Sequence, residues 1–357
     1  MNMAFFPSSL LSAYWNGAAT YYRGLIKALH HRGHRITVYE PDAYDRQKHR
    51  DMDPPSWADV VVYENSEEAA LRSLEAARGA DMIVKTSGIG VFDELLESAV
   101  LEYKRPDNYI VFCDVDAPAT LERVEQNPED AFRACIPRYD FIFTYGGGPP
   151  VVRGYESLGA QLCVPIYNGL DPETHHPVPP NANFEADLGF LGHRLPDREA
   201  RVEDFFLSAA GQLPNEKFLL GGIGWDARPL PPNVRNLGHV YTADHNAFNC
   251  TPRMVLNISR ASMARYGYSP ATRVFEAAGA GACLITDYWE GIDFFFEPET
   301  EILSARNGSE VAAHVQNIDP ERARKIGEAA CKRALARHTY AHRAAEFDQI
   351  LEGAYAK

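Results

Sequence analysis

The sequence predicts an α/β protein of two domains, each built on a parallel sheet with helices on both faces. Three observations support this: a length of 357 residues, a regular alternation of short apolar runs with helical segments, and a break in that alternation after residue 172. The length suits two domains. The apolar runs are continuous rather than alternating, which is typical of strands buried on both faces of a parallel sheet.

The first domain is assigned to residues 1–172. It opens with a strand at residues 3–6, a polar turn and a helix from Gly17 to about His31, for which Asn16 is the expected N-cap. Gly33 ends this helix before the next strand, which is the order of a βαβ unit. The strands expected in this domain are residues 36–39, 60–63, 82–84, 109–112, 141–144 and 162–166, with a helix at 67–78 among those between them.

A proline-rich stretch at residues 172–184 indicates a linker, which we assign to residues 173–185. The second domain is assigned to residues 186–338, and the last segment, 339–357, is predicted to be a helix capped by Thr339. Asp319 is the expected cap of the helix before it, with Pro320 in its first turn. The strands expected in this domain are residues 186–192, 217–220, 255–258 and 283–286.

Composition excludes several classes of function. The formal net charge is −14 and the basic residues are scattered, which argues against a nucleic-acid partner. No segment approaches the roughly 18 uncharged apolar residues of a membrane helix, and we expect no signal peptide. The six cysteines are far apart without a CxxC pair, so we interpret them as buried thiols in a reducing, cytoplasmic compartment.

The strongest chemical signal is the segment 269–287. Ser269 is a good N-cap and Pro270 suits the first turn of a helix that carries Arg273 and Glu276 on one face. The free N–H groups of a helix N-terminus can bind a phosphate, and a carboxylate on the same helix can accept both hydroxyls of a ribose. The alternative is that Arg273 and Glu276 form an ordinary exposed ion pair.

A weaker signal, Asp114-Val115-Asp116, follows the strand at 109–112 and is expected at a carboxyl end of the sheet. Asp116 is a candidate for the base that activates an acceptor hydroxyl. An Asp-x-Asp sequence can also hold a metal or cap a loop, and we favour the loop role over both. We predict no metal site.

Two glycine clusters also follow strands. Gly146-Gly147-Gly148 has neither GxGxxG spacing nor a Lys-Ser/Thr pair, so we interpret it as a tight turn. In the segment 221–225, Gly222 would let the backbone approach a ligand, and Trp225 is either a stacking surface for a base or sugar or an ordinary packing residue. The pairs His30-His31 and His175-His176 are interpreted as surface residues.

The segment Arg273-Val274-Phe275-Glu276-Ala277, followed by Gly279-x-Gly281 and a strand to Thr286-Asp287, resembles the core signature of the CgeB-like (spore maturation protein-like) glycosyltransferases. The likeness covers about residues 186–350. The other segments that carry it are 187–192, 238–241, 255–258, Glu301-Ile302 and 338–343. Residues 16–18 and 33–38 fit only the general pattern of GT-B enzymes.

The resemblance implies a GT-B fold of two Rossmann-like domains facing a central cleft, with the C-terminal helix crossing back to the first domain. It implies a nucleoside-diphosphate sugar of the UDP or GDP type as donor, an unidentified small molecule, glycan or protein as acceptor, and no required cofactor or metal. Glu276 would hold the ribose, as in retaining enzymes of this fold. The other donor contacts implied are His239 and Val240 for the base, Gly192, Thr272, Arg273 and Arg194 for the diphosphate, and Asn16 and Gly17 from the first domain.

One position departs from the broader retaining group. Tyr268 stands where that group has a second glutamate near the donor sugar, so retention of configuration stays open. The alternatives are a nucleotide-sugar epimerase, a phosphorylase of the same fold, or a non-catalytic protein that binds nucleotide sugars. A nicotinamide-dependent oxidoreductase is disfavoured because no strand is followed by GxGxxG. The oligomeric state is also left open.

Overall fold

The structure is a computed structural model that describes residues 1–14, 16–88, 90–196 and 198–355. The chain divides into two compact units. The first comprises residues 1–168 and the C-terminal helix, and the second comprises residues 169–339. Within the described residues, no helix combines the length and apolarity needed to cross a membrane.

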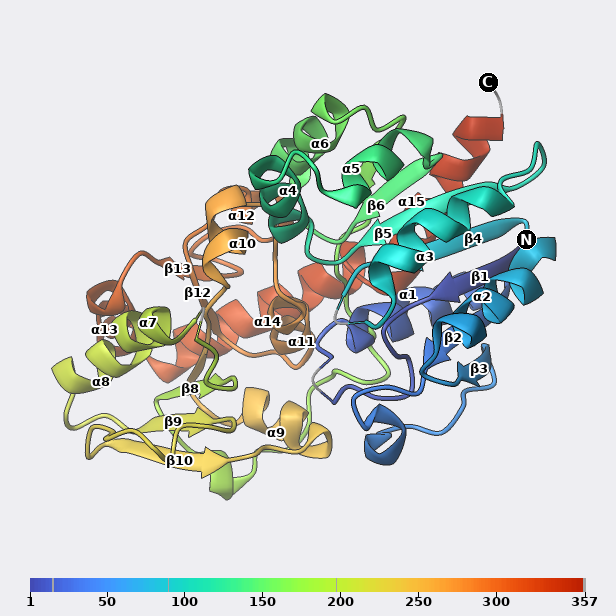
Figure 1. Cartoon of the computed structure of the whole chain (residues 1–357). Coiled ribbons are helices and arrows are strands. Elements are labelled where there is room, and N and C mark those ends of the chain that lie inside the picture. The colour runs from blue at the N-terminus through green and yellow to red at the C-terminus, as the bar shows by residue number, and fades with distance from the viewer. Residues whose placement is uncertain (15, 89, 197, 356–357) are drawn as a thin grey trace. The chain divides into compact units, whose positions relative to one another are not determined.

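The first unit contains a seven-stranded, all-parallel sheet in the order β3-β2-β1-β4-β5-β6-β7 (Figure 1). Its strands are β1 (Asn2–Phe6), β2 (Arg35–Pro41), β3 (Asp59–Tyr63), β4 (Met82–Thr86), β5 (Tyr109–Asp114), β6 (Phe141–Thr144) and β7 (Cys163–Pro165). Its helices are α1 (Ala19–His31), α2 (Glu67–Ala76), α3 (Asp93–Ala99), α4 (Ala117–Gln126), α5 (Ala131–Cys135), α6 (Gly148–Ser157) and α15 (Tyr340–Tyr355).

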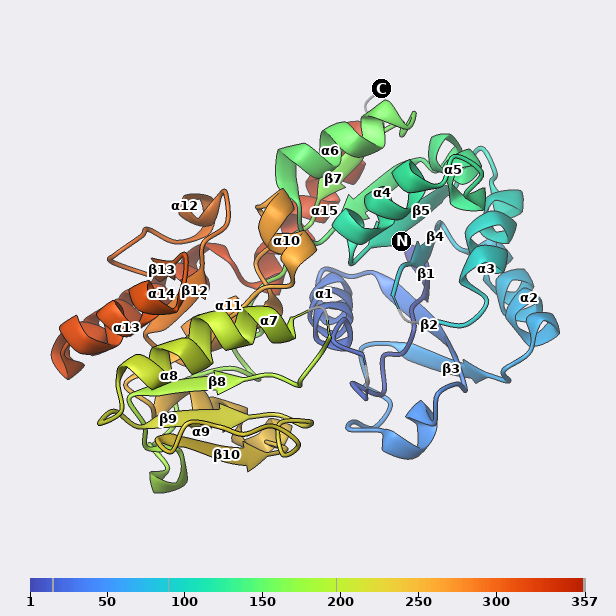
Figure 2. The same ribbon diagram turned by 60° about the vertical axis from the view of Figure 1, so that its left-hand side comes forward.

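The second unit contains a six-stranded, all-parallel sheet in the order β10-β9-β8-β11-β12-β13 (Figure 2). Its strands are β8 (Leu188–Leu191), β9 (Phe218–Gly221), β10 (Val234–Gly238), β11 (Met254–Asn257), β12 (Leu284–Asp287) and β13 (Leu303–Ala305). Its helices are α7 (Glu199–Val202), α8 (Ser208–Gln212), α9 (His245–Cys250), α10 (Ala261–Tyr266), α11 (Thr272–Gly279), α12 (Ile292–Phe295), α13 (Gly308–Asn317) and α14 (Pro320–Arg337).

Helix α15 belongs to the first unit because it packs on α1 across a close helix contact. Gly24 of α1 faces the ring of Tyr340, and a Cβ at Gly24 would lie 2.1 Å from that ring. Phe347 of α15 reaches the sheet, where its ring centroid is 4.8 Å from that of Phe143. The C-terminal helix therefore returns to the first unit, as expected, although residues 356–357 of the predicted helix lie outside the described residues.

The main differences from the predicted elements lie at sheet edges. Strand β3 was expected to be buried, but Asp59 and Val61 are exposed because β3 is an edge strand. Strands β10 and β13 were not predicted. The first is a partly exposed edge strand of mixed polarity, and the second has only three residues. The predicted linker, 173–185, lies within the second unit.

Two predicted helix caps are wrong and one is confirmed. Helix α1 begins at Ala19, and the Asn16 amide instead donates to the carbonyls of Ser9 and Ser12. Helix α11 begins at Thr272, while the Ser269 hydroxyl donates to a backbone carbonyl in the preceding turn. Both short side chains satisfy loop carbonyls, which competes with capping. Asp319 does cap α14, since its Oδ1 accepts from the Arg322 N–H at 2.8 Å.

Candidate functional site

The strand order of the second sheet reverses between β8 and β11. In open parallel sheets, ligands bind at the carboxyl ends of the strands beside such a reversal. The loop that leaves β8 at Gly192 lies at this point. We therefore expect the candidate site to include this loop and the segments that surround it.

The loops after β8 and β9 are fixed to each other by a backbone contact that only glycine permits. Gly222 has φ +127°, and a Cβ there would lie 2.2 Å from the Gly192 carbonyl oxygen. The Gly192 N–H donates to the Gly221 carbonyl at 2.8 Å, and the Gly222 N–H donates to Gly238 at 2.7 Å. The ends of β8, β9 and β10 thus form one rigid surface.

Trp225 supports this surface from the protein interior and offers no exposed ring for a ligand to stack on. Its indole is fully buried, and its Nε1–H donates to the Gly192 carbonyl at 2.8 Å. The predicted stacking of Trp225 on a base or sugar is wrong, because neither ring face reaches solvent. The alternative, ordinary packing, is the correct one.

Helix α11 carries two charged side chains that are not paired with each other. Glu276 is only 8% exposed, and among the described residues neither Glu276 nor Arg273 forms a hydrogen bond or ion pair. Burial lowers the pKa of the Arg273 guanidinium, and Glu276 opposes that shift through its charge. The alternative interpretation as an exposed ion pair is therefore wrong.

Arg198 and three histidines interact electrostatically with one another or with the charged residues of α11. Burial lowers the pKa of His193, and the charges of His239, Arg198 and Arg273 lower it further. The rings of His193 and His239 are stacked, with centroids 6.4 Å apart. Burial and Arg273 likewise lower the pKa of His245, while Glu276 raises it.

Arg198 was not identified from the sequence and lies over the loop after β8. One of its Nη atoms donates to the His193 carbonyl at 2.9 Å, and a Cβ at Gly192 would lie 2.7 Å from the guanidinium. Its Cζ is 5.8 Å from the ring centroid of Phe190. In the sequence, Arg198 is marked only by its place six positions after the glycine that follows β8. This spacing is too common to identify a functional arginine.

Four predicted residues occupy other positions around this surface. Arg194 pairs with Glu199 at 2.7 Å, so its charge is already balanced. Thr272 is the partly exposed first residue of α11. The Val240 side chain is buried in a small apolar cluster, and its carbonyl accepts from His245. Tyr268 has φ +46°, and its ring packs against Gly291.

His239 begins the loop after β10, where an exposed aromatic ring accompanies it. The His239 and Tyr241 ring centroids are 4.6 Å apart at an interplanar angle of 88°. Tyr241 is 68% exposed. The loop therefore offers two aromatic rings and a glycine backbone at Gly238 within one short segment.

In the first unit, Asp114 is a buried structural residue. Its Oδ1 accepts from the Ser87 hydroxyl at 2.7 Å and the Asp116 N–H at 3.0 Å, and its Oδ2 accepts from Tyr155 at 2.5 Å. This confirms a loop-capping role for the Asp-x-Asp segment, carried by Asp114. Among the described residues no group of three or more His, Cys, Asp or Glu is arranged to hold a metal.

The remaining predicted residues of the first unit lie near carboxyl ends of strands. Asp116 is partly exposed and directly precedes α4 without capping it. Asn16 is buried and Gly17 is exposed. The glycine turn is confirmed, since Gly147 has φ +91° and a Cβ there would lie 2.0 Å from Val151.

We predict that His193 makes stability depend on pH. Its Nδ1 accepts from the Ile223 N–H at 3.0 Å, and its pKa is lowered from the ordinary 6.5. The unfolded chain therefore binds this proton first, and the free energy of unfolding should fall as the pH drops from about 7.5 to about 5.5. His193→Asn, which keeps an acceptor for Ile223, should reduce that fall in urea titrations.

The exposed His31→Asn is the matched control and should leave the pH dependence unchanged. Equal pH dependence in the wild type and in His193→Asn would contradict the assignment.

Known proteins resemble this chain both in sequence and in fold. Residues 198–349 match the protein family described as "Glycosyl transferase-like". No curated protein matches the sequence.

Solved structures match over nearly the whole chain. HepE of Anabaena, solved with UDP and glucose, is 14% identical with a TM-score of 0.71, covering 99% of this chain and 100% of its own. Sucrose-phosphate synthase from Thermosynechococcus elongatus is 14% identical with a TM-score of 0.70, covering 100% and 99%. At such identities the likeness establishes the fold, here the two-sheet GT-B fold. The chain thus has the GT-B fold, and its residues 198–349 match a glycosyl transferase-like family.

Proposed function

We propose that the chain transfers a sugar from a nucleoside-diphosphate sugar whose nucleotide binds at the carboxyl edge of the second sheet. The observation that carries this proposal is Glu276, a buried carboxylate that accepts no hydrogen bond from any described residue. Its carboxylate oxygens are therefore available to accept hydrogen bonds from a ligand. The two hydroxyls of a ribose would supply the missing donors.

The diphosphate would bind at the N-terminus of α11, between Arg273 and Arg198. A helix N-terminus presents free N–H groups and a positive dipole end to an anion. Arg273 has no internal partner to give up, and Arg198 lies close enough to His193 to lower its pKa. This local positive charge would attract an anionic donor to a chain whose formal net charge is −14.

The loop 238–241 is the candidate base site. His239 and Tyr241 offer aromatic rings there, and Gly238 allows close backbone approach. HepE, of the same fold, was solved with UDP and with UDP-glucose, which favours a uridine donor over a guanosine donor here. Membership of the CgeB-like subfamily is part of this proposal and is supported by the order of the segments 187–192, 238–241 and 273–277.

In the transfer step, the bond between the sugar's anomeric carbon and the diphosphate oxygen breaks while an acceptor hydroxyl bonds to that carbon. Arg273, Arg198 and the α11 dipole would stabilise the charge that develops on the leaving diphosphate. We propose Asp116 as the group that takes the acceptor's proton, since it is partly exposed at a carboxyl edge. Tyr268, strained at φ +46°, would contact the donor sugar. We propose retention of configuration, which requires the acceptor hydroxyl to approach the anomeric carbon from the face that the diphosphate leaves. We also propose a cytoplasmic location.

Replacing Glu276 is the sharpest test of the nucleotide site. Glu276→Gln should raise the Kd for UDP about tenfold or more, since hydrogen bonds to a charged group contribute about 1.5–3 kcal/mol. The melting temperature should stay nearly unchanged, because Glu276 forms no hydrogen bond or ion pair with the described residues. Calorimetric titration and a thermal melt measure the two quantities.

Glu185→Gln, an exposed glutamate of the same unit, is the control and should alter neither quantity. If UDP affinity were the same in Glu276→Gln and in the wild type, Glu276 would have no role toward the ribose.

We propose that transfer needs no metal, because cationic side chains and the α11 dipole meet the diphosphate. Excess chelator should then leave the rate of UDP release from UDP-glucose unchanged. If activity were lost and magnesium or manganese restored it, a bound metal ion would instead stabilise the negative charge of the leaving diphosphate.

A further inference from the structure

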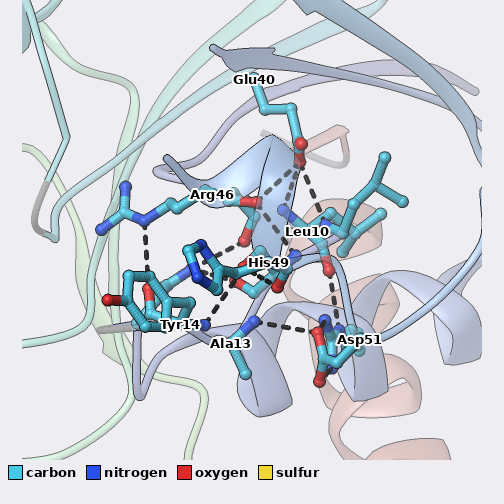
Figure 3. A network of polar contacts seen from close by, with 12 residues as sticks. Leu10, Ala13, Tyr14, Glu40, Arg46, His49 and Asp51 are labelled. Carbon is cyan, nitrogen blue, oxygen red and sulfur yellow. Dashed lines mark hydrogen bonds and ion pairs between the residues drawn. The ribbon is translucent and has the colours of Figure 1, made fainter. Parts of the chain in front are cut away.

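The loop between β1 and α1 in the first unit is held by polar contacts from several other segments. Its described residues, 8–14 and 16, follow the carboxyl end of β1, next to the reversal of strand order between β1 and β4. Its contacts come from the end of β2 and from the short 3-10 helix Arg46–His49 that follows (Figure 3). The loop has no regular secondary structure, so these contacts determine its shape.

Glu40 is the centre of this network. Its side chain is completely buried at the end of β2. One carboxylate oxygen, Oε2, accepts from the backbone N–H of Leu10 at 2.5 Å, from that of Leu11 at 3.2 Å and from the Ser9 hydroxyl at 3.2 Å. The other oxygen, Oε1, accepts from the Gln47 amide at 2.6 Å.

Two successive backbone N–H groups that point at one oxygen form the kind of concavity that binds phosphates in other loops after a first strand. Here the anion at Leu10 and Leu11 is the protein's own carboxylate. The site is therefore already filled, and a phosphate of the donor could enter only by displacing Glu40. The buried donors would then be left without an acceptor, which is unfavourable.

Other charged groups hold both flanks of the same loop. Arg46, fully buried, donates to the carbonyls of Ser8 at 3.2 Å and Tyr14 at 3.4 Å. Asp51 accepts from the Ala13 N–H at 3.0 Å. Arg23 completes the link, since it donates to the Leu10 carbonyl at 2.7 Å and pairs with Asp51 at 2.7 Å.

We propose that Glu40 is a positioning residue: an internal anion that fills the amide site of the β1–α1 loop and sets the loop's shape for the transfer step. The proposal rests on the proposed function, because it assigns nucleotide binding to the second unit and the shape of this loop matters for catalysis only if the chain transfers a sugar. Glu40 acts through the loop and touches no substrate.

The variants Glu40→Gln, Gln47→Glu and the two combined test this. A carboxylate has two acceptor oxygens, whereas an amide has one, so Glu40→Gln cannot satisfy the loop N–H groups and Gln47 together. The combined variant restores complementarity, because the introduced amide can accept from the loop and donate to the new carboxylate at position 47. Arg50, which already donates to Gln47 at 2.8 Å, would stabilise that carboxylate.

Amide hydrogen exchange of the segment 8–13 should speed up in Glu40→Gln and return toward the wild-type rate in the combined variant. The kcat for UDP release from UDP-glucose should fall about tenfold or more, as expected when a reacting group is misplaced. It should recover in the combined variant, while the Kd for UDP stays within about twofold of wild type throughout.

The exposed Glu64→Gln in the same unit is the control, with wild-type exchange and kcat expected. Unchanged exchange in Glu40→Gln would overturn the internal-anion assignment, and unchanged kcat despite faster exchange would overturn the positioning role. A fall in UDP affinity would show instead that this loop binds the nucleotide. If the wild type neither bound UDP nor released it from UDP-glucose, the proposed function would be wrong. The amide hydrogen exchange rates would still show whether Glu40 is the internal anion of the loop.

Discussion

The contact between the loops after β8 and β9 underlies the candidate donor site. The Gly192 carbonyl lies where a Cβ of residue 222 would be, and it accepts the indole hydrogen bond of the buried Trp225. This arrangement fixes the path of the chain as it leaves β8. It thereby sets the position of His193, whose pKa is lowered by the charges of Arg198 and of Arg273 on α11. Without it, the cationic groups would have no fixed relation to Glu276.

The two units differ in how the polar groups at their carboxyl edges are satisfied. In the first unit, the amides of Leu10 and Leu11 are satisfied by the buried Glu40. In the second, Arg273 and Glu276 are left without partners among the described residues. A closed site holds a loop in one shape, whereas an open site holds donors and acceptors ready for a ligand. This contrast explains how a chain with a formal net charge of −14 can be suited to an anionic donor at one edge only.

Sequence patterns predicted the fold and the position of α11 well, because both depend on local periodicity. Strands buried on both faces have continuous apolar sequences, which are easy to recognise. Strands β10 and β13 were not predicted, because β10 is a half-exposed edge strand and β13 is very short. The roles of individual side chains were less predictable. Trp225 and Asn16 were assigned to the ligand, yet both satisfy carbonyls of their own chain. Arg198 and Glu40 act through contacts distant from any motif, so no local pattern marks them.

The central claim is that the nucleotide binds at the carboxyl edge of the second sheet, over α11. A crystal structure of the chain with UDP tests it most directly. The account predicts ribose hydroxyls within hydrogen-bond distance of Glu276, the diphosphate beside Arg273 and Arg198, and uracil against the loop 238–241. Nucleotide bound instead at the β1–α1 loop with Glu40 displaced, or in the cavity of about 380 Å³ around Arg253 at the opposite edge of the second sheet, would contradict it.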